Sequence, residues 1–290
     1  MTEHVELSRY TTIGTGGAAR SFVRPKTLDE LVEVVAEARD ENVPVEVIGL
    51  GSNVLVADDG VDALVLKLDG ELAAARVEGD LLIAGGGAPN AVCLHRARAA
   101  GLGGFEFASA IPGTAGGGVR MNAGAYGREW REVLVDVVVV DENGPHLFTP
   151  DDLALSYRHS SLGPGDVVAQ ARFRLEPSSP EAVKAKVAEL LRQRKSTQPT
   201  NKRTFGSVFK NPSSELGAGR AIEECGLKGH QVGGALISPR HANFIENAGG
   251  ATSADCIALM AEARRRVHER FGVELEHEVQ FLGPLELPPL

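Results

Sequence analysis

Apolar residues recur at helical spacing in several stretches of this 290-residue chain. After Thr27, one face of residues 28–40 is apolar through Leu28, Leu31, Val32, Val35 and Ala38. Thr27 and Glu30 have the spacing of a capping box, so the pattern predicts an amphipathic helix over 28–40. The same reasoning predicts helices over 89–100, 180–195, 218–225 and 252–271. In the last of these helices, we expect the consecutive arginines 264–266 to face solvent.

Shorter runs, rich in β-branched residues, predict strands between these helices. The predicted strands are 44–50, 61–68, 81–84, 133–141, 167–175, a strand and turn within 234–246, and 273–282. Glu142-Asn143-Gly144 should turn the strand 133–141 into a hairpin. In 273–282, Glu274, Glu276, Glu278 and Gln280 alternate with mainly apolar residues, and one of these acids could point into a site.

A chain of this length can form one large domain or two, and two is our expectation. The boundary is placed at Pro177-Ser178-Ser179-Pro180, where Ser179 has the position of an N-cap and Pro180 that of the first helical residue. This division gives domains of residues 1–176 and 177–290.

Glycines gather at residues 14–17, 49–51, 85–87, 101–104 and 113–118. The stretch Thr11–Ala19 formally contains G-x-G-x-x-A, but the extended, Pro-terminated segment that follows excludes a dinucleotide-binding turn and helix. Gly49–Val56 has two open interpretations: a backbone cradle for phosphate, or a tight hairpin turn. Residues 101–127 are too glycine-rich for a stable helix, and we expect them to pack around a bound molecule rather than form a flexible loop.

The net charge of −9 argues against a broad nucleic-acid surface. The basic residues Arg192, Arg194, Lys195, Lys202 and Arg203 are either a solvated face or a diphosphate site. Three widely spaced cysteines favour neither a disulfide framework nor a zinc site, and no metal is expected. Without a signal-like N-terminus or a long apolar run, the sequence predicts a cytoplasmic protein that is not in the membrane.

Thr204–Pro212 combines small, aromatic and hydrogen-bonding residues around Ser207. Gly206 before Ser207 and Asn211-Pro212 after it suit a sharp turn that presents one hydroxyl. The alternative is an ordinary loop with a capping serine.

Six segments, taken in order, resemble one family of flavoenzymes. They are Thr11–Ala18, Gly49–Val56, Ala108–Gly127, Tyr157–Ser160, Gly206–Pro212 and Glu278–Phe281. Through them the chain resembles the UDP-N-acetylenolpyruvoylglucosamine reductases, commonly called MurB, over essentially its whole length. The resemblance implies an α+β fold. An FAD-binding fold of the vanillyl-alcohol-oxidase (PCMH) type, in two lobes, would occupy residues 1–176. A smaller α+β substrate domain would occupy 177–290, with its last strand returning to the active site.

The resemblance also implies which residues bind FAD, noncovalently. The segment from Gly49 to Val54 and the segment from Ser109 to Gly118 would hold the pyrophosphate, and Asn122 to Gly124 would lie near the flavin. The individual residues are Gly49, Gly51, Ser52, Asn53, Val54, Ser109, Pro112, Gly113, Thr114, Gly117, Gly118, Asn122, Ala123 and Gly124.

The implied reaction reduces UDP-N-acetylglucosamine enolpyruvate to UDP-N-acetylmuramate with NADPH, a step in making peptidoglycan precursors. Hydride would come from N5 of FAD and a proton from Ser207. Arg158 would bind the substrate carboxylate and stabilise the enolate, and Glu278 would polarise it. Lys210 and Asn211 would join Arg158 in binding the substrate.

The chain departs from the family pattern at Arg203-Thr204-Phe205-Gly206, where the family usually has Pro, Ser and Ala. The short span from Arg158 to Ser207 leaves no room for the substrate-covering Tyr loop of one branch, so the shorter branch is implied. Two alternatives stay open: another FAD-dependent oxidase or dehydrogenase of the same fold, and a non-catalytic flavin or nucleotide-sugar binding protein. The oligomeric state is open, with a monomer favoured.

Overall fold

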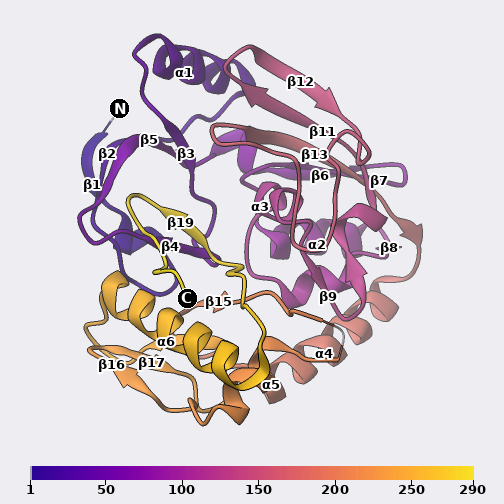
Figure 1. Cartoon of the computed structure of the whole chain (residues 1–290). Helices are drawn as coiled ribbons and strands as arrows, with labels where there is room; N and C mark the ends of the chain where they lie inside the picture. The colour runs from indigo at the N-terminus through magenta and orange to yellow at the C-terminus, as the bar shows by residue number, and fades with distance from the viewer. Residues whose placement is uncertain (1, 214) are drawn as a thin grey trace. The chain divides into compact units, whose positions relative to one another are not determined.

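A computed structural model describes residues 2–213 and 215–290 of the chain (Figure 1). The chain divides into two compact units, each made of separate segments, and each unit is described by itself. The first unit holds Ser21–Leu50 and Ala63–Arg194, and the second holds Glu3–Arg20, Gly51–Asp62 and Lys195–Leu290. Strands β2 (Ala18–Val23) and β5 (Val61–Leu66) each run from the second unit into the first.

The first unit is built on a five-stranded antiparallel sheet of order β12-β11-β13-β7-β6. The strands are Gly144–Phe148 (β12), Leu134–Asp141 (β11), Val167–Arg174 (β13), Leu81–Gly85 (β7) and Ala75–Glu78 (β6). The predicted hairpin is confirmed, since Asp141 pairs with Gly144. Strand β3 (Val45–Val47) pairs in parallel with β5. Short pairs join β8 (Leu102–Gly103) to β14 (Glu176–Pro177) and β9 (Gly124–Ala125) to β10 (Arg128–Glu129).

The predicted helices of this unit agree closely with the structure. They are α1 (Leu28–Asp40), α2 (Asn90–Ala99) and α4 (Pro180–Thr197), whose last turn extends into the second unit. A further helix, α3 (Ala115–Arg120), was not predicted. The Thr27 hydroxyl accepts the Glu30 N–H, as the capping pattern predicts, and the Ser179 hydroxyl accepts the Ala182 N–H. Two 3-10 helices, Glu106–Ala110 and Trp130–Glu132, contribute aromatic residues to the core.

Three interpretations of glycine-rich segments are wrong. Residues 101–127 contain α3, because the Thr114 side chain caps Gly117 and the Gly116 N–H bonds to the Gly86 carbonyl. The flexible-loop alternative is also wrong, since Phe105 and Phe107 are buried against Trp130. The hairpin interpretation of Gly49–Val56 fails because β3 and β4 (Val54–Val56) lie in different sheets.

The second unit is built on a four-stranded antiparallel sheet of order β15-β18-β17-β16. These strands are Thr204–Ser207 (β15), Phe244–Asn247 (β18), Ala235–Ile237 (β17) and Gln231–Val232 (β16). Helix α6 (Ser253–Phe271) packs on β16, β17 and α5 (Ala218–Glu224) (Figure 1). Thr252 and Asp255 form a capping box at its first turn. A separate parallel pair joins β4 to β19 (Gln280–Leu282). The unit also holds β1 (Thr2–Glu6) from Glu3 onward and a 3-10 helix at Leu7–Tyr10.

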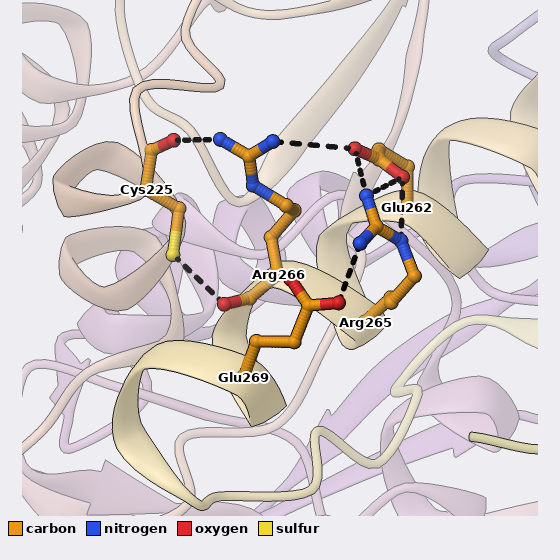
Figure 2. A network of polar contacts seen from close by, with 5 residues as sticks. All are labelled: Cys225, Glu262, Arg265, Arg266 and Glu269. Carbon is orange, nitrogen blue, oxygen red and sulfur yellow. Dashed lines mark hydrogen bonds and ion pairs between the residues drawn. The ribbon is translucent and has the colours of Figure 1, made fainter.

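The prediction that all three arginines of α6 face solvent is wrong for one of them. Arg264 is only 9% exposed, because its guanidinium donates to the carbonyls of Leu275 and Pro288 and pairs with Glu274. Arg265 and Arg266 are exposed, as predicted. Figure 2 shows that Arg265 lies between Glu262 and Glu269, whereas Arg266 reaches Glu262 and the carbonyl of Cys225, at the end of α5.

The predicted strand over residues 273–282 forms only at its end, as β19. The alternation of side chains still holds, with Leu275 and Val279 buried and Glu274 and Glu276 exposed. Across residues 276–278 the chain has a different neighbour, the segment that follows β15.

Candidate active site

Ser207 is the last residue of β15. An irregular register between β15 and β18 sets the direction of its side chain. Thr204 pairs with Glu246 and Ser207 with Phe244, so β15 has one more residue than β18 between these pairs. Gly206 takes up the extra residue at φ +84°, where a side chain would be strained and would lie 3.1 Å from the Ser52 carbonyl. A bulge of this kind turns a side chain away from the regular pleat. Ser207 is half-buried at this point.

The segment after Ser207 runs antiparallel to residues 276–278. Phe209 forms a bridge with His277, the Glu278 N–H donates to the Val208 carbonyl at 2.8 Å, and the Lys210 N–H donates to the Glu276 carbonyl at 2.9 Å. Ser207 and Glu278 are therefore brought into neighbouring segments of the second unit.

Asn53 joins this arrangement through the carbonyl of Glu278. Its amide nitrogen donates to that carbonyl at 3.1 Å, and its own carbonyl accepts the Gln280 N–H at 3.0 Å. Gly51, at φ +63°, lies against Tyr10, whose carbonyl is 2.0 Å from where a Cβ would be. The predicted cofactor segment Gly51–Val54 is thus held beside Glu278, while Gly49 belongs to the first unit.

The predicted substrate ligands Lys210 and Asn211 both have protein partners. The Lys210 ammonium pairs with Glu276 at 2.5 Å, and its side chain is only 18% exposed. The Asn211 side-chain oxygen accepts the N–H of Ala218, the first residue of α5, at 3.0 Å.

Arg158 lies in the first unit, at the tip of a two-residue turn. Ser156 and His159 exchange both backbone hydrogen bonds at 3.1 Å, and Arg158 has φ +54°, a conformation that costs a non-glycine residue energy. Its guanidinium donates to the Gly124 carbonyl at 2.8 Å and lies 5.0 Å from the centre of the Tyr157 ring. The structure thus brings Arg158 together with the segment predicted to lie near the flavin.

The other residues of that segment are tied to the protein. Asn122 is fully buried at φ +37°, and its side chain bonds to Glu129, the Ser156 carbonyl and the Arg131 N–H. The Ala123 carbonyl accepts the Trp130 N–H. Because its hydrogen-bonding groups are committed, the Asn122 side chain supports the segment and offers little to a ligand.

The glycines of α3 have different surroundings. A Cβ on Gly118 would lie 2.4 Å from the Trp130 ring, whereas one on exposed Gly117 would meet only the Thr114 hydroxyl, at 3.6 Å. A Cβ on Gly49 would lie 2.9 Å from that same hydroxyl. Packing explains Gly118 and Gly49, and only Gly117 leaves room for a ligand.

The loop before α3 contains Ser109, Pro112 and Gly113. Among the residues described, the buried hydroxyl of Ser109 has no hydrogen-bond partner, which is costly unless a ligand or water supplies one. Gly113 has φ +145°, and Asn90 holds the loop by donating to the carbonyls of Ile111 and Gly113. These features fit a site for a polar cofactor group at Ser109, Gly113 and Gly117.

Three charged residues near this region were not singled out by the sequence. The Lys67 ammonium donates to the Gly49 carbonyl at 2.5 Å, and burial lowers its pKa, with a smaller effect from Arg24. Burial raises the pKa of Glu46, and the charge of Arg120 partly offsets this shift. Burial lowers the pKa of Arg120, and the charges of Asp166 and then Glu46 partly offset it. Lys67 directly follows β5, Glu46 lies in β3 and Arg120 in α3. No sequence signal indicates that these three side chains are partly buried, so only the folded structure identifies them.

Four of the basic residues within 192–203 are exposed: Arg192, Lys195, Lys202 and Arg203. Arg194 is half-buried in the first unit near Tyr126, and desolvation lowers its pKa. In the second unit, Lys202 lies 3.8 Å from Glu246.

Two further observations concern membrane-spanning helices and metal sites. Within residues 2–213 and 215–290, no helix combines the length and apolar character needed to cross a membrane. The same residues contain no group of three or more His, Cys, Asp or Glu side chains placed to hold a metal ion.

Comparison with known proteins gives two family models. The model described as "FAD binding domain" matches residues 19–149, and "UDP-N-acetylenolpyruvoylglucosamine reductase, C-terminal domain" matches residues 198–282. These matches confirm the predicted fold class, a PCMH-type FAD-binding domain joined to a MurB C-terminal domain.

Relatives match over nearly the whole chain. UDP-N-acetylenolpyruvoylglucosamine reductase of Anaeromyxobacter dehalogenans (strain 2CP-C) is 44% identical, over 98% of this chain and 85% of its own. The enzyme of that name from Erythrobacter litoralis is 42% identical, over 98% of this chain and 88% of its own. The crystal structure of MurB from Thermus caldophilus has a TM-score of 0.85 and 38% identity, covering 97% of this chain and 99% of that chain. The chain belongs to the UDP-N-acetylenolpyruvoylglucosamine reductase family.

Proposed function

We propose that this chain reduces UDP-N-acetylglucosamine enolpyruvate to UDP-N-acetylmuramate, with FAD as cofactor and NADPH as reductant. The observation that carries the proposal is the bulge that presents Ser207 beside the segment of Glu278, in a chain of this family. When bound, FAD would accept a hydride from NADPH and pass it to the methylene carbon of the enolpyruvyl group.

Ser109, Gly113 and Gly117 would hold the cofactor, because the Ser109 hydroxyl has no partner among the described residues and Gly117 has open space. The remaining predicted ligands, in 49–54, 112–118 and 122–124, contribute backbone groups or support. Of these, the Asn122 side chain hydrogen-bonds to Glu129, and Gly118 packs against the Trp130 ring, so both support the unit itself.

Arg158 would bind the substrate carboxylate. Its guanidinium is a permanent positive charge with paired donors. It suits a substrate carboxylate that becomes part of an enolate when hydride adds to the enolpyruvyl methylene carbon. The turn Ser156–His159 and the bond to Gly124 fix this side chain before the substrate binds.

Ser207 would donate the proton that completes the reduction. A serine hydroxyl is a weak acid, but the acceptor carbon is strongly basic, so correct placement suffices. Glu278, half-buried beside this segment, would polarise the enolate if protonated. Lys210 and Asn211 would contribute to nucleotide-sugar binding.

We also propose that residues 1–176 bind FAD and that residues 177–290 form the substrate domain. The two family models support this division. We place the chain in the shorter branch of the family, which lacks the substrate-covering Tyr loop. Much of the span from Arg158 to Ser207 is occupied by β13 (167–174) and α4 (180–197), which leaves little room for such a loop. A cytoplasmic location and a monomeric state complete the proposal.

The purified protein should be yellow with bound FAD. NADPH should bleach the flavin absorbance, and UDP-N-acetylglucosamine enolpyruvate should restore it anaerobically. A protein that cannot take up FAD contradicts the proposal. Bleaching by an alcohol or hydroxy acid instead of NADPH would favour another oxidase or dehydrogenase of this fold. Flavin binding without any bleaching would favour a non-catalytic binding protein.

The variant Ser207→Ala separates the two half-reactions. Flavin reduction by NADPH should persist, because no proton is donated to carbon in that step. Reoxidation by the substrate should slow by roughly 10²-fold or more, the usual contribution of a positioned proton donor. Stopped-flow absorbance measures both steps, and near-normal reoxidation would remove Ser207 from the mechanism.

A further inference from the structure

Asn243 is a buried polar residue directly before β18, only 4% exposed. It lies at the end of the loop between β17 and β18, which the Ser238 N–H closes by donating to the Phe244 carbonyl at 2.8 Å. No sequence motif singles it out, and none of the roles above uses it.

The Asn243 side chain bonds to both backbone groups of Phe209, two residues after Ser207. Its oxygen accepts the Phe209 N–H at 2.9 Å, and its nitrogen donates to the Phe209 carbonyl at 2.8 Å. The Asn243 carbonyl also accepts the Val208 N–H at 2.9 Å. Three hydrogen bonds from one residue thus hold the two positions that follow Ser207.

The opposite edge of this segment is held by residues 276–278, through the bonds of Val208 and Lys210 already described. The extra residue in β15 interrupts its pairing with β18 between Thr204 and Ser207. Beyond Ser207, where β15 ends, the Asn243 side chain supplies the bonds that hold Phe209 on this side.

We propose that Asn243 is a positioning residue for Ser207: its carboxamide fixes the backbone of Phe209 and so sets where the Ser207 hydroxyl lies relative to Glu278. This inference rests on the proposed role of Ser207 as proton donor. An amide suits the task because it offers one acceptor and one donor side by side, matching the two groups of a peptide residue. Loss of either bond leaves a buried backbone group unsatisfied and lets the segment shift.

The test compares Asn243→Asp and Asn243→Leu with wild type in the full-length, FAD-loaded protein. A displacement of about 1 Å can cost about 10²-fold in rate, so reoxidation by UDP-N-acetylglucosamine enolpyruvate should slow by roughly that factor. Flavin reduction by NADPH should stay within about twofold of wild type on the same reasoning. A variant that is merely less stable would not slow one half-reaction alone.

Asn243→Asp adds a pH signature and is close enough in shape to fold if Asn243→Leu does not. Its carboxylate can accept the Phe209 N–H but repels the Phe209 carbonyl, whereas the protonated form can donate to that carbonyl. Burial should raise the pKa of this new carboxyl, so reoxidation should recover as the pH falls from 8 toward 5.5. His241, His277, Glu276 and Glu278 also face this segment, so rates are compared with wild type at each pH.

Asn247→Asp is the matched control, because Asn247 is an amide at the other end of β18 that bonds to Ile13, Gly249 and Ala251. It should leave the ratio of the two half-reactions unchanged. If Ser207→Ala slows reoxidation but both Asn243 variants do not, the positioning role is wrong and the proposed function stands. If Ser207→Ala itself has no effect, the proton-donor role fails.

Discussion

Gly117 and Gly118 are neighbours in α3, but their missing side chains have different causes. Gly118→Ala should destabilise the protein by about 1–3 kcal/mol, because the new methyl group overlaps the buried Trp130 ring. Gly117→Ala has room for its methyl group and should stabilise the FAD-free protein by up to about 1 kcal/mol through helix propensity. Urea unfolding of the two FAD-free variants measures the difference.

Gly117→Ala also tests the cofactor site. If Gly117 lies against FAD, this variant should bind FAD more weakly than wild type although it is no less stable. Unchanged FAD affinity, measured by fluorescence titration, would remove Gly117 from the proposed site.

His241 should make the stability of the protein depend on pH. Its Nδ1 accepts the Asn243 N–H at 3.3 Å, and burial lowers its pKa below the ordinary 6.5, with Lys228 adding to the shift and Glu223 opposing it. Below pH 6.5 the unfolded chain binds a proton that the native state resists, so stability is complete above 6.5 and falls as the pH drops toward the lowered value.

His241→Asn keeps an acceptor near the position of Nδ1 but cannot titrate. Its unfolding midpoint should therefore fall less steeply than that of wild type below pH 6.5. The exposed His230, replaced by Asn, is the control and should follow wild type. Identical slopes for His241→Asn and wild type would show that His241 is not responsible.

Sequence patterns identified residue roles only where a local or family signal existed. Ser207, Arg158 and Glu278 were predicted as site residues through motifs, and their roles stay predictions. The hydrogen bonds of Asn243 and Arg264 were missed, because their partners are distant in sequence, Phe209 for one and Pro288 for the other. Periodicity placed Arg264 on a solvent-facing run because it cannot show that the C-terminal residues cover this part of α6.

At the scale of elements, α6 depends on a cap from outside the helix. Besides Thr252 and Asp255, Asp58 accepts the N–H groups of Ser253 and Ala254 at 2.8 and 3.0 Å. Asp58→Ala should cost about 0.5–2 kcal/mol, the range for losing an N-cap, since it also removes a negative charge from the helix N-terminus.

The neighbouring Asp59 is exposed and provides the control. Asp59→Ala should change the free energy of unfolding by less than about 0.5 kcal/mol. Equal effects of the two variants in thermal or urea unfolding would contradict a specific cap by Asp58.

Helix limits were predicted well, because capping residues and apolar spacing are local signals. Strand pairing was predicted less well. The sequence of 273–282 shows its alternation, but it cannot show that β19 pairs with β4 while residues 276–278 lie beside Phe209. α3 was missed because three consecutive glycines oppose a helix, and Thr114 and the Gly86 carbonyl stabilise it nevertheless.

At the scale of the whole molecule, the chain passes repeatedly between the two units. The core of the second unit contains Ile13 and Leu55 as well as residues 205–279, and β19 has its partner in β4. The fragment 177–290 alone should therefore lack cooperative unfolding, which far-UV circular dichroism measures during urea titration of the fragment and of the full chain. A fragment that unfolds cooperatively would show that residues 3–20 and 51–62 are not needed.

The pairing of β4 with β19 also bears on how the protein is made. Residues 54–56 leave the ribosome long before their partner, residues 280–282. Until residues 280–282 have followed, β4 has exposed backbone groups and an apolar Leu55 without its final neighbour, a condition that favours aggregation. Because this contact spans almost the whole sequence, its closure should be among the late and slow steps of folding.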